Sequence, residues 1–112
     1  MIISAATVLI DQELQKEVWL EIEDGVIRSI NSGTTPEYDL RYDGILIPGF
    51  VDIHCDGGGG KYFGSLTDSE IALVISTHRA GGTVAGLASL VTEQIENLIS
   101  QIKRLVQFAQ RN

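Results

Sequence analysis

The sequence is poor in the features that mark several classes of protein. Its one cysteine, Cys55, cannot form an internal disulfide, and this favours a reducing compartment such as the cytoplasm. Eight Lys and Arg residues against fifteen Asp and Glu give a formal charge of −7, and no basic cluster could follow a phosphate backbone. No apolar run reaches the roughly 18 residues that span a bilayer, and the apolar N-terminal run has no preceding basic residue, unlike a secretory signal. We therefore expect a soluble cytoplasmic protein that binds neither nucleic acid nor membrane.

The overall composition favours a folded domain. Apolar residues make up 44% of the chain and charged residues 21%, close to the averages of globular proteins. The 112 residues suit one small domain, whereas a complete eight-stranded α/β barrel usually needs about 250. The chain can bury a core but is less than half as long as a barrel enzyme.

The first 48 residues have the pattern of short antiparallel strands. "EVWLEIEDGVIRSI" alternates apolar and polar residues and contains Asp24-Gly25, a dipeptide typical of tight hairpins. We predict a hairpin from Val18 to Ile30, further strands in residues 1–10 and 43–48, and a loop in residues 31–39. Residues 1–48 should form part of a small β-sheet domain.

From Thr67 the pattern changes to helices that alternate with apolar strands. Thr67 and Glu70 form a capping-box motif and Gly81-Gly82 supplies a stop, which predicts a helix over residues 68–80. "TVAGLASLV", residues 83–91, is typical of a strand buried on both faces of a parallel sheet. "EQIENLISQIKRLVQFAQ", residues 93–110, is an amphipathic helix. Residues 49–112 therefore predict a βαβα unit.

The most informative stretch is "HCDGGGG", residues 54–60. If "GFVDIHCD" is the first strand of that unit, alternation puts Val51, Ile53 and Cys55 on one face and Phe50, Asp52, His54 and Asp56 on the other. An imidazole and a carboxylate two residues apart on a strand can bind one divalent ion, and zinc, iron, manganese and cobalt all accept such ligands. His54 and Asp56 are therefore the predicted metal ligands, while Cys55 is predicted to be buried on the opposite face.

Other interpretations of these residues stay open. His-x-Asp also occurs as a hydrogen-bonded pair at strand ends, and four glycines also mark mobile turns. The run "GGGGK" resembles a phosphate-binding loop, but that motif needs glycine at Cys55 and Ser or Thr at Tyr62. His78 shares a helix face with Ile71 and Val74 near the helix C-terminus, which favours a structural role. Asp52 could be a buried carboxylate that accepts hydrogen bonds from loop amides.

Two motifs together resemble a known family. "ILIPGFVDIHCDGGGG" resembles the segment that leads into the barrel of the amidohydrolase superfamily, and "THRAGGTVAGLASLVT" is similar to the N-terminal region of N-acetylglucosamine-6-phosphate deacetylases. The resemblance covers essentially the whole chain. It implies a partial β-sandwich domain in residues 1–48 and the first βαβα portion of a TIM-like barrel in residues 49–112. It also implies metal-dependent hydrolysis of a phosphorylated amino sugar, N-acetylglucosamine 6-phosphate, to glucosamine 6-phosphate and acetate.

The sequence departs from the family pattern in two ways. Asp56 stands where the family has a second histidine, so the metal position at His54 is weakened, altered in preference or unused. The chain also ends before the segments that supply the family's metal-binding glutamate, later histidines and catalytic aspartate. Catalytic residues are therefore expected beyond residue 112, and we expect the chain alone to be inactive.

Three functions follow as alternatives. The chain could be the N-terminal portion of a deacetylase, either because it was cut from a longer chain or because the remaining residues are encoded separately. It could be a non-catalytic remnant that self-associates as a homo-oligomer through uncovered sheet edges and apolar helix faces. It could also belong to another amidohydrolase, such as a dihydroorotase or hydantoinase relative.

Overall fold

The computed structural model describes residues 1–35, 37–65 and 67–111. It divides into two compact units, residues 1–48 and residues 49 onward, which are described separately. The predicted loop over residues 31–39 includes Pro36, and the predicted barrel portion ends at Asn112; both residues lie outside the described parts. Whether the units belong to a sandwich and a barrel stays a prediction.

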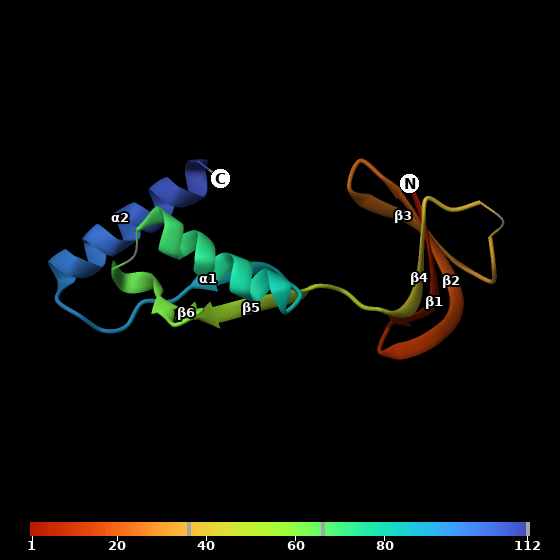
Figure 1. Cartoon of the computed structure of the whole chain (residues 1–112), viewed down its shortest axis with the longest axis horizontal. Helices are drawn as coiled ribbons and strands as arrows, with labels where there is room; N and C mark the ends of the chain where they lie inside the picture. Colours follow the sequence, from red (N-terminus) through yellow and green to blue (C-terminus); the bar gives the residue numbers. More distant parts are fainter. Residues whose placement is uncertain (36, 66, 112) are drawn as a thin grey trace. The chain divides into compact units, whose positions relative to one another are not determined.

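The first unit contains the strands labelled β1 to β4 in Figure 1. They form one four-stranded sheet with the order β3-β2-β1-β4. Its strands are β1 (Ile2–Ile10), β2 (Glu13–Glu23), β3 (Val26–Ser32) and β4 (Leu40–Leu46). β1 pairs antiparallel with β2 and parallel with β4, and β2 pairs antiparallel with β3. The small β-sheet predicted for this half is therefore present, but the expectation of antiparallel strands was wrong for β4, which lies parallel to β1 and spans Leu40–Leu46 rather than residues 43–48.

The predicted hairpin turn is confirmed at Asp24-Gly25. Glu23 pairs with Val26 across the turn, and both central residues have positive φ, 51° for Asp24 and 74° for Gly25. These values suit a two-residue type I′ turn, whose twist matches that of the flanking strands. Strand β2 begins at Glu13, five residues before the predicted start at Val18, because a second tight turn links it to β1.

The interior of the first unit is small and mainly apolar, with Ser4 as a buried polar residue. Ala5, Val8 and Val18 are buried together, and Ile10 and Leu46 pack against them. All five side chains come from β1, β2 and β4, so the apolar face of the sheet holds the unit together.

The second unit alternates strands and helices along the chain. It contains β5 (Phe50–Cys55), β6 (Gly57–Gly58), β7 (Lys61–Tyr62), a 3-10 turn η1 (Phe63–Ser65), α1 (Asp68–Ala80), β8 (Thr83–Ala88) and α2 (Ile95–Arg111). β5 and β8 pair in parallel, with α1 as the crossover between them. This is the order and strand direction predicted for a βαβα unit.

Helix α1 has the predicted bounds and start. Thr67 accepts a hydrogen bond from the Glu70 amide, and the Glu70 carboxylate accepts one from the Thr67 amide, which completes the capping box. At the other end the amides of Gly81 and Gly82 donate to carbonyls in the last turn. Helix α2 begins at Ile95, two residues after the predicted start, and extends to Arg111.

Strand β8 differs from its prediction in length and burial. It ends at Ala88 rather than residue 91, and its residues from Val84 to Ala88 are exposed, with Val84 72% exposed. A strand is buried on both faces only when neighbouring strands and helices cover it. Among the described residues β8 pairs only with β5, so the apolar residues that suggested burial are uncovered.

The core of the second unit lies where β5, η1 and α1 meet. Cys55, Phe63, Ile71 and Val74 are buried together. Partly buried side chains from the segment after β8 and from α2 pack against this cluster: Leu90, Leu105 and Phe108. Among the residues described, no helix is long and apolar enough to cross a membrane.

Candidate metal-binding residues

The glycine run at residues 57–60 forms a hairpin. β6 and β7 pair antiparallel, Gly57 with Tyr62 and Gly58 with Lys61, and the linking residues Gly59 and Gly60 have φ values of 61° and 77°. Two consecutive positive φ angles form the type I′ turn that glycine adopts most easily. The run is therefore a tight turn at the end of β5.

A bulge in β5 changes which side chains share a face. Asp52 pairs with Gly86 and Cys55 with Ala88, so three steps along β5 match two along β8. The Asp52 carboxylate accepts a hydrogen bond from the His54 amide at 3.0 Å, which fixes the irregular segment. An extra residue in one strand reverses the alternation after it. Strict alternation put Asp52 and Cys55 on opposite faces; this prediction was wrong, because the structure puts them on the same side of the strand.

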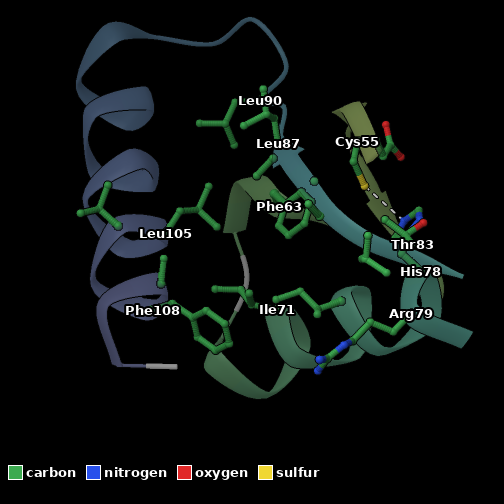
Figure 2. A pocket seen from close by; sticks show the side chains of 18 of the residues that line it. Cys55, Phe63, Ile71, His78, Arg79, Thr83, Leu87, Leu90, Leu105 and Phe108 are labelled. Atoms are coloured by element: carbon green, nitrogen blue, oxygen red, sulfur yellow. Dashed lines mark hydrogen bonds between the residues drawn. The ribbon is translucent and has the colours of Figure 1, made fainter. Parts of the chain in front are cut away.

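Asp52 and Cys55 meet His78 from the last turn of α1. One potential ligand atom from each residue lies within 4.8 Å of the other two. The Cys55 Sγ and His78 Nε2 atoms are 3.2 Å apart, as the dashed line in Figure 2 shows. We call these three residues the Asp52–Cys55–His78 cluster. Among the described residues, it is the one group of three or more such side chains spaced closely enough to hold a metal ion.

His78 also contacts the glycine hairpin. Its Nε2 atom lies 2.8 Å from the Gly57 carbonyl oxygen, and a Cβ atom added at Gly58 would lie 2.9 Å from the same nitrogen. The missing side chain at Gly58 therefore leaves room for the imidazole to reach the backbone of the hairpin.

Burial sets the state of the Cys55 thiol. The side chain is 8% exposed and packs in the core of the second unit, as predicted. This burial raises the pKa of Cys55 above its ordinary value; the hydrogen bond to Gly57 opposes the shift, and the nearby carboxylates of Asp52 and Asp56 add to it. Without a bound cation the residue is therefore a neutral thiol at neutral pH.

The two predicted metal ligands, His54 and Asp56, lie at the end of β5 and just beyond it, and both are exposed. An imidazole and a carboxylate open to solvent have suitable donor chemistry for a divalent ion. A protein site usually needs at least three such donors, and no group of three among the described residues includes either side chain. The structure thus presents two exposed side chains of suitable chemistry, and among the described residues they do not belong to a group large enough to hold an ion.

The contact between Cys55 and His78 was not predicted from the sequence, although the predicted faces of both residues were compatible with it. Cys55 was predicted to be buried on the face of its strand opposite His54, and His78 was predicted on the face of α1 that carries Ile71 and Val74. Both positions face the same core. The unexpected member is Asp52, because the bulge that brings it to this side has no clear sequence mark.

An apolar hollow adjoins the cluster within the second unit. It has a volume of about 630 Å³ and lies between β8, α1 and α2 (Figure 2). The three cluster residues line it together with side chains such as Leu87, Leu105 and Phe108. Its walls are mostly hydrophobic, so the polar groups of the cluster form a small hydrophilic end.

A second contact ties the hairpin to the start of α1. The Lys61 ammonium lies 2.7 Å from the Glu70 carboxylate. The hydrogen bond from Lys61, together with those from Thr67, lowers the pKa of Glu70 to about 2. The hairpin therefore contacts both ends of the helix, through Lys61 at the first turn and Gly57 at the last.

Comparisons with known proteins point to one group of enzymes. No protein-family model matches the sequence. N-acetylgalactosamine-6-phosphate deacetylase from Shewanella sp. (strain ANA-3) is 33% identical over 104 residues, which cover 86% of this chain and 26% of that protein. N-acetylglucosamine-6-phosphate deacetylase from Bacillus subtilis (strain 168) is 25% identical over 103 residues, which cover 88% of this chain and 26% of that protein.

Solved structures agree with the sequence matches. The crystal structure of N-acetyl-D-glucosamine-6-phosphate deacetylase from Mycobacterium smegmatis matches all of this chain with a TM-score of 0.88 and 37% identity. A mutant of that enzyme in complex with N-acetyl-D-glucosamine-6-phosphate matches with a TM-score of 0.87. A Xaa-Pro dipeptidase matches with a TM-score of 0.52 at 15% identity, a likeness of fold alone.

All these matches are partial with respect to the relatives. The chain spans 26% of the two curated relatives and 33% of the Mycobacterium smegmatis chain. The matched part is the N-terminal portion, and it includes both units of the structure. The chain therefore belongs to the N-acetylglucosamine- and N-acetylgalactosamine-6-phosphate deacetylase family of amidohydrolases, as a counterpart of its N-terminal portion.

Proposed function

We propose that residues 1–112 form the N-terminal segment of a metal-dependent hydrolase that deacetylates N-acetylglucosamine 6-phosphate to glucosamine 6-phosphate and acetate. The observation that carries this proposal is the match of the whole chain to the Mycobacterium smegmatis deacetylase, at 37% identity and a TM-score of 0.88. A mutant of that enzyme binds N-acetyl-D-glucosamine-6-phosphate in its crystal structure, which supports a phosphorylated amino sugar as the substrate.

In this proposal His54 and Asp56 supply two of the ligands of a divalent ion. When bound, such an ion lowers the pKa of water and polarises an amide carbonyl. The exposed His54 and Asp56 side chains at the end of β5 are accessible to an ion and to further ligands. Because the described residues offer no third donor beside them, we propose that the chain alone is inactive and that the remaining ligands and the proton-transfer group come from a C-terminal segment.

The uncovered surface of the second unit supports a completing segment. Ile53 is 74% exposed and Leu87 is 64% exposed, and each belongs to the β5–β8 pair. Large side chains at such exposure indicate a surface that another polypeptide covers. We propose that this polypeptide continues the parallel sheet next to β8, which would place residues 49–112 as the first part of a barrel.

The proposal is tested by acetate release from the purified chain, alone and mixed with a separately expressed segment that follows the matched portion of the Mycobacterium smegmatis enzyme. We expect no release from either part and metal-dependent release from the mixture. Deacetylation by residues 1–112 alone would contradict the proposed division of the site. A complex that forms and binds metal yet releases no acetate would contradict the proposed function.

A panel of possible substrates distinguishes deacetylation of amino-sugar phosphates from the reactions of other amidohydrolases. The match to an N-acetylgalactosamine-6-phosphate deacetylase at 33% identity makes the galactosamine epimer a specific second candidate. The panel therefore contains both 6-phosphates, unphosphorylated N-acetylglucosamine, and the cyclic amides dihydroorotate and hydantoin. We expect turnover of a 6-phosphate only; turnover of a cyclic amide would favour the other amidohydrolases.

A further inference from the structure

Three different kinds of metal-binding side chain lie close together between β5 and α1. Asp52 and Cys55 come from the strand and His78 from α1, so the set shares no residue with His54 and Asp56. A thiolate, an imidazole and a carboxylate are all ligands of zinc in proteins, and thiolates disfavour magnesium and calcium. The chemistry of the donors therefore favours a transition metal such as zinc over magnesium or calcium.

The spacing of the donors is close to that of a formed site. Ligand atoms bound 2.0–2.3 Å from a tetrahedral zinc ion lie roughly 3.3–3.8 Å from one another. The Cys55 Sγ to His78 Nε2 distance of 3.2 Å already approaches this range. The largest separation within the cluster is below 4.8 Å, so closure on an ion needs a side-chain shift of about 1 Å.

We propose that Asp52, Cys55 and His78 bind one zinc ion through a carboxylate oxygen, Sγ and Nε2, with water in the fourth position. On binding, the Cys55 S–H bond breaks, its proton passes to solvent, and the sulfur bonds to the metal without any change of oxidation state. The His78 nitrogen leaves the Gly57 carbonyl and turns to the ion. The metal then joins β5 to the C-terminal turn of α1.

The surroundings provide access and support. Asp52 and His78 are only half-buried, and all three side chains line the open hollow beside β8, so an ion has a route to the cluster. Asp52 keeps its backbone hydrogen bond from the His54 amide through one oxygen, Oδ1, which leaves the other oxygen for the metal.

The direct test is cobalt titration of the full chain followed by absorption spectroscopy. A sulfur-to-cobalt charge-transfer band appears in the near ultraviolet only when a thiolate binds the ion. Because Cys55 is the chain's single cysteine, such a band reports this residue alone. We expect the band to saturate at one equivalent and to disappear when zinc is added. A folded chain that shows no band at saturating cobalt overturns the proposal, and this result requires no variant.

Variants test the other two ligands. Cys55→Ser should abolish the band, and His78→Gln and Asp52→Asn should each weaken cobalt binding at least about tenfold. Ser76→Ala is the matched control, because Ser76 lies on the same helix and its hydroxyl donates to the Leu73 carbonyl, away from the cluster. If the band and affinity are unchanged in both His78→Gln and Asp52→Asn, the proposal is wrong. Circular dichroism of each variant checks that it folds.

The same cobalt titration distinguishes the Asp52–Cys55–His78 cluster from the metal site that is proposed at His54 and Asp56. His54→Gln should leave the charge-transfer band unchanged while it reduces metal-dependent deacetylation by the completed enzyme. If the band is absent and the completed enzyme is active, only the zinc inference fails. If the band is present and the completed enzyme is inactive, only the proposed function fails.

Discussion

The Cys55 Sγ atom lies 3.2 Å from Nε2 of His78, and the same nitrogen lies 2.8 Å from the Gly57 carbonyl oxygen. One side chain at the end of α1 thus contacts both β5 and the hairpin that follows it. The glycine-rich turn is fixed by this contact from the helix.

His78→Ala should destabilise the second unit when metal is removed with a chelator. The substitution leaves the half-buried Gly57 carbonyl without its imidazole partner, which costs about 1–3 kcal/mol of unfolding free energy. Urea unfolding measures the change. Ser76→Ala on the same helix should change the free energy by much less, and equal effects of the two substitutions would argue against a specific contact.

Gly57→Ala should also destabilise this unit. A Cβ atom at Gly57 would overlap the Lys61 carbonyl oxygen and the backbone of Tyr62, which a rotamer change cannot relieve. Overpacking of this kind costs about 1–3 kcal/mol or more. Gly81→Ala is the control, since a Cβ there meets its nearest atom at an ordinary 3.4 Å. Thermal unfolding should separate the two variants, and a stable Gly57→Ala protein would show that the hairpin packs differently.

Ile71→Ala tests the core of the second unit. Ile71 is 1% exposed and belongs to the cluster with Cys55, Phe63 and Val74. Its truncation leaves a cavity and should lower the unfolding free energy by about 2–5 kcal/mol. Leu73→Ala, at a site 44% exposed on the same helix, should have a clearly smaller effect. The comparison uses the denaturant midpoints of the two variants, provided that the dependence of the unfolding free energy on denaturant concentration stays the same.

The start of α1 should lose stability in acid. The folded-state pKa of Glu70 is lowered to about 2 from its ordinary value of 4.5, so the unfolded chain binds a proton first as the pH falls. The contribution of Glu70 is therefore fully present above pH 4.5 and is lost as the pH falls toward 2. Glu70→Gln should be less stable than the parent near pH 7, and the difference should shrink over this interval.

A matched variant identifies the cause of that pH dependence. Glu96→Gln removes a carboxylate from the first turn of α2, so it shares the helix-dipole effect with Glu70 but lies outside the capping box of α1. We expect a weaker pH dependence from this substitution. Identical pH profiles for the two variants would assign the effect to the dipole and not to Lys61 and Thr67.

Local sequence signals predicted the elements that depend on local chemistry. Thr67, Glu70 and the Gly81-Gly82 pair fix both ends of α1, because caps act within a single turn. Asp24-Gly25 likewise predicted its hairpin, since the turn type needs residues that tolerate positive φ. The β5, α1, β8 order followed from the change in periodicity.

Features that depend on pairing partners were not predictable. The bulge in β5 arises from its register against β8, more than thirty residues away, and it brings Asp52 to the side of Cys55. The exposure of β8 depends on which strands adjoin it, and the apolar sequence of Val84 and Leu87 carries no information about their presence. His54 and Asp56 were found by their spacing, but their role as ligands stays a proposal.

We propose that residues 1–112 form the N-terminal segment of a deacetylase. The most direct measurement is acetate release from N-acetylglucosamine 6-phosphate by a hybrid in which these residues replace the matched segment of the Mycobacterium smegmatis enzyme. We predict metal-dependent activity that falls on the order of 100-fold or more with His54→Ala. A folded, metal-bound hybrid that releases no acetate, or one that is unaffected by His54→Ala, would contradict the account.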